Sequence, residues 1–299
     1  MKKLLIILFS LAGAVILAIG GYALYLYLSI SNTADSMHEP LIRESNNLRD
    51  VDFSSQEPLS FLILGIDAEE STRGRSDTMI VLTVNPEEES MKMVSIPRDT
   101  RTEMVGRGNE DKINHAFAFG GPEMAMDTVE NFLDIPIDYY VSINMDGFKD
   151  IVDAVDGVTV DNAFAFEQSG YDFSEGEIEL DGDEALAYVR MRKNDPDGDF
   201  GRNTRQRQLV DAVIHEGAQI SSVTKAGSIL DALGNNVRTN LTFEEMRDLQ
   251  SNYRQARHDL EEFEISGNGT RINGVYYLEV PEEERQRVSG ELKDHLNVD

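Results

Sequence analysis

The chain has 299 residues, a formal net charge of −28 at pH 7 and no cysteine. This length suffices for one large domain with a sizeable core, and the lack of cysteine excludes disulfides, thiolate metal sites and cysteine nucleophiles. The negative charge argues against non-specific binding to nucleic acid, which needs basic surface to displace counterions. We interpret most of the acidic residues as a solvated surface.

The N-terminal segment predicts a membrane anchor. Lys2 and Lys3 precede a run without charged residues over 4–30. About 20 apolar residues span a bilayer as a helix, and flanking lysines favour the cytoplasmic side. We therefore predict a cytoplasmic tip at 1–3, a transmembrane signal-anchor helix at 4–30 and the rest of the chain outside. The alternative is a signal sequence that is cleaved at the small residues around 18–21.

Residues 31–57 are polar and mixed in charge, which indicates an extracytoplasmic stalk. The apolar runs that follow, at 61–66, 79–84 and 91–96, are typical of buried strands. A hairpin turn at 85–90 is predicted between the last two of these strands.

Helices and strands interleave in the rest of the chain. Helices are predicted at 122–133, 147–155, 182–190, 203–220 and 282–296, and further strands at 139–144 and 158–161. This alternation predicts one α/β domain with a mixed sheet between helical layers.

Charged residues follow or precede the three predicted strands. Asp67 comes directly after the first strand, residues 75–77 (Arg, Ser, Asp) stand before the second, and residues 97–99 (Pro, Arg, Asp) follow the third. These side chains should converge on one edge of the sheet, where open α/β sheets bind ligands. Two carboxylates there can hold a hard cation such as Mg²⁺. Ordinary turn chemistry is the alternative.

A second cluster is basic. Six of the 27 basic residues fall within 18 positions, where an even spread would place one or two: Arg190, Arg192, Lys193, Arg202, Arg205 and Arg207. The guanidinium fork matches phosphate oxygens. Helical spacing puts one set of residues on a single face: Arg202, Arg205, Gln206 and Leu209. A helix that ends near Arg190 frees Arg192 to turn inward. The alternative is a surface network of ion pairs.

Apolar residues at 116–119, together with Phe148, are candidates for a lipid groove, although such residues more often belong to the core, which we favour. The sequence contains no Walker motif, no G-x-S-x-G motif and no histidine spacing typical of a metal site.

Seven segments, in this order, resemble the LytR–CpsA–Psr family. They are FLILGID at 61–67, GRSDTM at 74–79, SIPRDT at 95–100, DKIN at 111–114, EALAYVRMRK at 184–193, DFGRNTRQRQ at 199–208 and INGVYYLEV at 272–280. The last of these resembles an extension found in the teichoic-acid-transferase branch. The resemblance implies a catalytic domain at 58–220 and a C-terminal extension at 221–299 packed on the same domain.

The resemblance also implies a fold and an activity. The fold is an α–β–α sandwich with a deep apolar pocket for a polyprenyl chain. The activity is transfer of an anionic glycopolymer, such as wall teichoic acid, from a polyprenyl-pyrophosphate carrier to a peptidoglycan hydroxyl. The implied cofactor is Mg²⁺ or Mn²⁺, and the implied location is the cell membrane of a Gram-positive-type bacterium, with the domain outside and no nucleic acid as partner.

The family's functional residues fall on particular positions of this chain. The metal ligands are Asp67 and Asp77; the pyrophosphate is bound by Arg75, Arg98, Arg190, Arg192, Arg202 and Gln206. Of these, Arg98, Arg190, Arg192 and Arg202 are also catalytic, and Asp99 is a candidate base. Two alternative functions stay open: a phosphohydrolase that releases lipid phosphate to water, and a non-catalytic envelope regulator.

Overall fold

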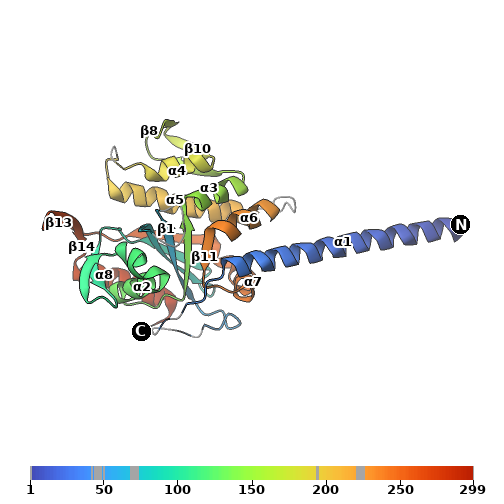
Figure 1. Cartoon of the computed structure of the whole chain (residues 1–299), viewed down its shortest axis with the longest axis horizontal. Coiled ribbons are helices and arrows are strands. Elements are labelled where there is room, and N and C mark those ends of the chain that lie inside the picture. Colours follow the sequence, from blue (N-terminus) through green and yellow to red (C-terminus); the bar gives the residue numbers. More distant parts are fainter. Residues whose placement is uncertain are drawn as a thin grey trace.

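A computed structural model describes residues 2–41, 43, 49, 51–67, 74–192, 195–219 and 226–298. Its centre is a six-stranded mixed sheet with the strand order β11–β6–β1–β2–β3–β12 (Figure 1). The bounds are β1 Leu59–Ile66, β2 Ser76–Asn85, β3 Ser90–Ser95, β6 Tyr139–Asn144, β11 Val237–Thr239 and β12 Asp259–Glu264. β2 pairs antiparallel with β1 and β3, while β6 runs parallel to β1 and β12 parallel to β3.

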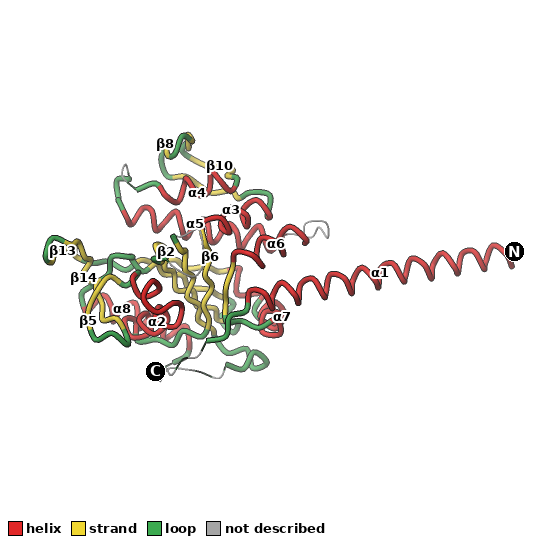
Figure 2. Tube along the Cα trace, viewed as in Figure 1, coloured by secondary structure: helices red, strands yellow, loops and turns green. Residues whose placement is uncertain are grey.

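Helices cover both faces of this sheet (Figure 2). On one face, Leu62 and Leu64 of β1 pack in a core with α2 (His115–Leu133) and α8 (Glu282–Leu296). On the other face, Phe61 packs with residues of α5 (Asp199–Gln219), α7 (Phe243–Asn252) and the 3-10 helix η1 (Arg254–His258). Successive side chains of a strand point to opposite faces, so the continuous apolar run of β1 fills both cores. The α–β–α sandwich with a mixed sheet is confirmed.

A smaller layer stands beyond α5. It consists of α3 (Met145–Ala154), α4 (Gly182–Arg190), β7 (Val158–Asn162) paired with β10 (Gly176–Leu180), and β8 (Phe166–Gln168) paired with β9 (Tyr171–Phe173). Its apolar core is built around Tyr188 and includes Leu209 of α5. Thus α5 links this layer to the central sheet.

Two more hairpins lie beside the sheet: β4 (Arg101–Met104) with β5 (Asn109–Lys112), and β13 (Asn268–Ile272) with β14 (Val275–Glu279). The turn between β13 and β14 is Asn273–Gly274, and both residues have positive φ, 51° and 83°. Asn-Gly is the preferred pair for such a type I′ turn, because glycine and asparagine tolerate that conformation best.

The predicted helix that starts at Pro122 is the regular part of α2. α2 begins earlier, at His115, but Gly120 and Gly121 inside it are not helical, and Gly121 has a φ of 66°. A proline fits the first turn after such a break because its missing N–H is not needed there. The predicted bounds of α4, α8 and β6 match those of the structure.

The N-terminal helix α1 (Lys2–Met37) contains the predicted span at 4–30 and continues beyond it. Among the residues that the structure describes, no helix combines the length and the apolar character that crossing a bilayer requires. α6 (Ala226–Asn236) packs against the C-terminal part of α1.

The stalk at 31–57 stays a prediction, and its described residues contact the domain. Residues 31–37 are helical, and Arg43 and Arg49 form ion pairs with residues of the domain. The buried guanidinium of Arg43 lies 2.7 Å from Asp127 and 2.6 Å from Glu130. The charge of Arg43 is therefore paired with α2 rather than solvated.

α8 is fastened to the β2–β3 hairpin by a buried histidine. The Nδ1 of His295 lies 2.6 Å from the hydroxyl of Thr83, and its Nε2 lies 3.0 Å from the hydroxyl of Ser90. The Asn85 amide donates to the His295 carbonyl at 2.9 Å. Burial lowers the pKa of His295, so the folded state holds this imidazole neutral.

We predict a pH dependence of stability from His295. The unfolded chain takes up a proton near pH 6.5, which the folded state resists, so the free energy of unfolding falls as the pH drops from 7.5 to 5.5. His295→Gln should show a smaller slope in urea titrations across this window. The exposed His258→Gln is the control. Equal slopes for His295→Gln and the parent would contradict the prediction.

Candidate active site

The predicted charged residues lie together at the edge of the sheet where β1 and β3 end and β2 begins. Ile66 at the end of β1 pairs with Ser76 at the start of β2, and Ser95 at the end of β3 pairs with Ile80. Asp67, Asp77 and Arg98 therefore lie at the same edge, as their positions beside the strands predicted.

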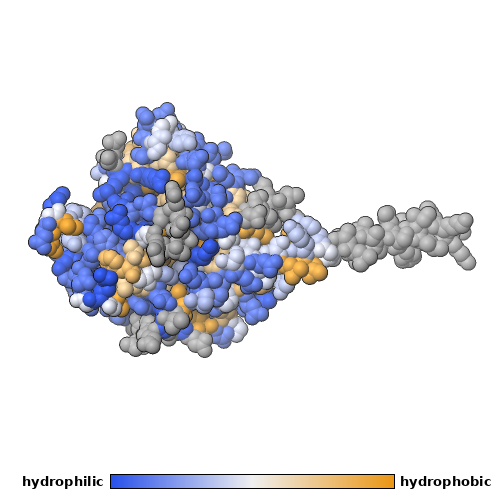
Figure 3. Space-filling view, in the orientation of Figure 1, coloured by the Kyte–Doolittle hydropathy of each residue, from blue (hydrophilic) through white to orange (hydrophobic). Residues whose placement is uncertain are grey.

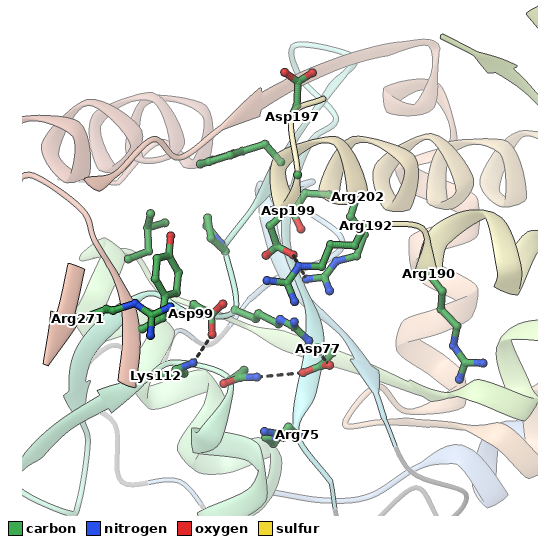
Figure 4. A pocket seen from close by; sticks show the side chains of 18 of the residues that line it. Arg75, Asp77, Asp99, Lys112, Arg190, Arg192, Asp197, Asp199, Arg202 and Arg271 are labelled. Carbon is green, nitrogen blue, oxygen red and sulfur yellow. Dashed lines mark hydrogen bonds and ion pairs between the residues drawn. The ribbon is translucent and has the colours of Figure 1, made fainter. Parts of the chain in front are cut away.

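A polar cleft of about 1190 Å³ opens at this edge (Figure 4). Its lining includes five residues that the sequence predicted to bind phosphate: Arg75, Arg98, Arg190, Arg192 and Arg202. It also includes residues that sequence reasoning missed: Lys112, Asn114, Asp197, Asp199, Arg271 and Tyr276. Asn114 is the last residue of the DKIN segment, which resembles the family, but no role was predicted for this residue.

Asp77 is held at the floor of the cleft by two donors. The Arg98 guanidinium donates to one carboxylate oxygen and forms an ion pair with it. The Asn114 side-chain amide donates to the other oxygen at 3.0 Å. Both carboxylate oxygens of Asp77 are thus oriented before any ligand binds.

Arg202 is a buried cation with unused donors. It is 7% exposed, and burial lowers its pKa. Its Nη2 lies 2.9 Å from an Asp199 oxygen, but out of hydrogen-bonding geometry, and its Nε also lacks a hydrogen-bond partner among the described residues. Asp199 is shared, since the Nε of Arg192 lies 3.3 Å from the same oxygen. One carboxylate therefore faces two guanidinium groups, and the cleft keeps capacity for an anion.

Arg190 and Arg75 carry further unbalanced charge. Within the described part of the chain, no carboxylate lies at ion-pair distance from either side chain, although both line the cleft. α4 ends at Arg190, and Met191 is extended. The chain turn predicted after Arg190 is confirmed, and it leaves Arg192 facing Asp199.

The other arginines of the basic cluster are structural. Arg205 lies 2.6 Å from Asp195 and donates to the carbonyl oxygens of Tyr188 and Met191. Arg207 pairs with two glutamates of β12, each at 2.8 Å. The ion-pair interpretation thus holds for these two residues, while Lys193 lies outside the described residues.

An apolar pocket of about 220 Å³ adjoins the polar cleft. Asp77, Arg190 and Arg202 line both spaces. The apolar pocket also has Ile63, Phe148, Leu186, Val189, Gln206 and Val210 in its wall. Phe148 therefore lines a groove. Ala116 and Phe117 belong to the core, as favoured for 116–119, but that prediction is wrong for Phe119, which is 42% exposed.

A second apolar space of about 690 Å³ lies further along the same side of the sheet. Ile63 lines both apolar spaces, and α5 contributes Val210 to the first and Ile214 with Gly217 to the second. These α5 positions recur at helical spacing, so one face of α5 follows β1 along both spaces.

Asp99, the candidate base, lines the polar cleft and is paired. The Nζ of Lys112 donates to its carboxylate at 2.6 Å. Lys112 in turn lies 5.8 Å from the ring centroid of Tyr277 on β14. The pairing orients Asp99 and places a cation beside it.

Asp67 and Asp77 fit a hard cation that is bound partly by the protein and partly by a substrate. Asp67 and Asp77 line the same apolar pocket at the cleft, and no group of three or more acidic or histidine residues arranged for a metal occurs in the described ranges. Mg²⁺ is commonly held by one or two carboxylates together with substrate phosphates and water, so two carboxylates suffice.

We predict different effects on stability for two neighbouring arginines. Arg205→Met leaves the buried Asp195 carboxylate unpaired and should cost about 3–5 kcal/mol of unfolding free energy. Arg202→Met removes a buried cation whose donors are incompletely used, so stability should be unchanged or higher. Urea unfolding of both variants measures this. Equal destabilisation by the two substitutions would make Arg202 a structural residue.

Known proteins resemble this chain over most of its length. A Halalkalibacterium halodurans protein named polyisoprenyl-teichoic acid–peptidoglycan teichoic acid transferase TagU is 64% identical over 303 residues, with 100% of both chains covered. The crystal structure of Bacillus subtilis TagU, 50% identical, matches with a TM-score of 0.66 over 80% of this chain and 97% of that chain. A structure of TagT bound to LIIa-WTA, 32% identical, matches with a TM-score of 0.73 over 87% and 100%. The LytR_cpsA_psr family matches residues 24–294, and the chain belongs to that family.

Proposed function

We propose that the protein transfers an anionic glycopolymer, of the teichoic acid class, from a polyprenyl-pyrophosphate carrier to a hydroxyl of peptidoglycan. The observation that carries this proposal is the junction of two unlike spaces. The arginine-rich cleft and the apolar pocket meet at Asp77, Arg190 and Arg202, which line both. A lipid pyrophosphate has the same division, with an anionic head and an apolar chain.

The relatives support the same substrate class. The Halalkalibacterium protein is named as a transferase from polyisoprenyl-teichoic acid to peptidoglycan, and TagT was solved with a ligand described as LIIa-WTA. The polyprenyl chain would lie in the apolar spaces along β1 and α5, and the pyrophosphate at the edge of the sheet.

The reaction needs positioning and charge neutralisation more than covalent chemistry. An acceptor hydroxyl oxygen attacks the phosphorus that carries the glycopolymer. The bond from that phosphorus to the bridging oxygen breaks, and lipid monophosphate leaves with the electron pair. Arg98, Arg192 and Arg202 neutralise the phosphate oxygens, and Arg190 does so at the entrance to the apolar pocket.

The acceptor proton needs a base, and we propose Asp99 for this role. It lies in the cleft lining and is oriented by Lys112. Lys112 then stabilises the phosphate charge next to Asp99, so that base and cation act on the same side of the cleft.

We propose that Asp67 and Asp77 hold Mg²⁺ or Mn²⁺ when substrate is present. Such an ion would neutralise negative charge on the pyrophosphate oxygens. The residues of the chain contribute the orientation, because Arg98 and Asn114 fix the Asp77 carboxylate.

We propose that α1 anchors the protein in the cell membrane, with the N-terminus in the cytoplasm and the domain outside. α1 exposes Tyr22, Leu24, Tyr25, Tyr27, Leu28 and Ile30, and Figure 3 shows apolar side chains where this helix meets the domain. Tyrosine is enriched at membrane interfaces. The ring of Tyr27 also packs against Phe243 of α7 with centroids 5.6 Å apart, so α1 would hold the domain close to the bilayer.

The transfer reaction should depend on the arginine fork. Arg202→Lys and Arg190→Lys keep the charge but lose bidentate binding, and we expect transfer to fall at least about tenfold, equal to about 1.4 kcal/mol of transition-state free energy. Asp99→Asn should lower kcat more than it changes KM. Transfer to purified peptidoglycan from a lipid pyrophosphate is the assay, and Arg285→Lys on the surface of α8 is the control.

Two outcomes would overturn this assignment. Lysine variants that transfer like the parent would exclude phosphate binding by these arginines. Release of lipid phosphate at the same rate with and without peptidoglycan, and without a linked product, would indicate a phosphohydrolase.

If Asp67 and Asp77 hold the metal, the substitution Asp77→Asn should weaken metal binding. Asp77→Asn should raise the Mg²⁺ concentration for half-maximal transfer at least about tenfold, because one carboxylate then holds the ion. Direct binding of Mn²⁺, followed by electron paramagnetic resonance in the presence of pyrophosphate, gives a readout without turnover. Asp161→Asn is the matched control. Unchanged Mn²⁺ binding by Asp67→Asn and Asp77→Asn would move the metal elsewhere.

The anchor predicts that α1 stays on the mature protein. N-terminal sequencing of protein extracted from membranes should begin at residue 1 or 2. Protease added to intact protoplasts should digest the domain. A mature N-terminus after residue 20, or a domain protected in protoplasts, would contradict the proposed topology.

A further inference from the structure

The polar cleft extends beyond the residues assigned to the pyrophosphate, toward the β13–β14 hairpin. This hairpin contributes Arg271, Tyr276 and Leu278 to the cleft lining. Figure 4 shows Arg271 on the opposite side of Asp99 and Lys112 from Arg190. The cleft thus has cationic groups at both ends, with the proposed reaction centre between them.

The hairpin is fixed to that centre by its backbone. The Leu278 amide donates to the Asp99 carbonyl at 2.9 Å, and Leu278 also forms a parallel bridge with Thr100. The Leu278 side chain is buried. Arg271 and Tyr276 therefore have defined positions relative to Arg98 and Asp99, although both side chains are exposed.

Arg271 has no acidic partner among the described residues. No carboxylate of the described residues lies within ion-pair distance of it, and its one hydrogen bond runs from Nη1 to the Gly274 carbonyl at 3.3 Å. In a chain with a net charge of −28, Arg271 thus joins Arg75 and Arg190 as cleft arginines without an acidic partner among the described residues. Its fork retains donors for an oxyanion.

Tyr276 provides an aromatic surface next to this charge. It is the cross-strand partner of Arg271 and is 40% exposed. Its ring lies over Gly269, where an added Cβ would come within 2.9 Å of the ring. The glycine therefore lets one ring face rest on the hairpin while the side chain stays accessible. Ligand pockets are commonly lined by aromatic side chains, and the apolar faces of sugar rings pack on such rings.

We propose that Arg271 and Tyr276 bind a sugar–phosphodiester unit of the donor glycopolymer, with Arg271 on the phosphodiester and Tyr276 against the sugar. This inference rests on the proposed function and adds a determinant of donor specificity to it. A polymer with repeated phosphodiesters presents a second anion beyond the reacting pyrophosphate, which matches the cation at the far end of the cleft. A neutral glycan backbone, as in peptidoglycan, would give Arg271 no phosphate to bind.

The test compares two donors with the intact protein. One is a lipid pyrophosphate that carries a single sugar, and the other carries a chain with two or more phosphodiesters. For Arg271→Ala we expect KM for the long donor to rise at least tenfold, and KM for the short donor to rise less than threefold, with kcat changing little. Arg271→Lys should fall between parent and alanine variant. Tyr276→Ala should act on the long donor in the same way, and Tyr276→Phe should restore most of the loss because the ring is kept.

Arg285→Ala, which removes an exposed arginine paired with Glu282 on α8, is the matched control and should leave both donors unaffected. Melting temperatures verify that the hairpin variants fold. An equal loss with both donors, no loss with either, or a raised KM for peptidoglycan instead of the donor would each overturn the proposal. The proposed function fails separately, if the parent protein transfers neither donor to peptidoglycan.

Discussion

The antiparallel pairing of β2 with both β1 and β3 determines where the charged groups of this molecule meet. The end of β1, the start of β2 and the end of β3 lie at one edge of the sheet. Asp67 directly follows β1, Asp77 is the second residue of β2 and Arg98 lies three residues after β3. Their positions are therefore set by backbone pairing and by the apolar side chains that hold β1 between two cores. A shift of one residue in this register would turn every apolar side chain of a strand to the wrong face.

The arginines of α5 are of two kinds, which differ in whether the fold supplies them with acidic partners. Arg205 and Arg207 are buried with acidic partners and brace the loop after α4 and the edge strand β12. Arg202, on the turn that faces the sheet edge, shares Asp199 with Arg192 and keeps unused donors. A cation that is buried with incomplete pairing costs stability, and an anionic ligand can offset this cost. The cleft therefore carries its positive charge where the apolar pocket begins.

Local patterns in the sequence predicted much of this arrangement. The continuous apolar runs predicted β1, β2 and β3, and the end of α4 at Arg190 followed from the loop residues beyond it. The edge strands β11 and β12 were not predicted, because β12 is rich in glutamate and its partner β3 is distant in sequence. Arg205 could not be distinguished from Arg202 by helical spacing. Their partners come from different segments, and only the fold brings these together. Lys112, Asn114, Asp199 and Arg271 were missed for the same reason.

In the proposed reaction, a peptidoglycan hydroxyl attacks the phosphorus bonded to the glycopolymer while the lipid-side phosphate leaves. A lipid pyrophosphate donor labelled with ³²P separately at each phosphorus tests this directly in a reaction with peptidoglycan. Label on the polymer-side phosphorus should enter peptidoglycan, and label on the lipid-side phosphorus should be released as lipid monophosphate. Lipid-side label in peptidoglycan, or polymer-side label released to water as free polymer phosphate, would contradict it.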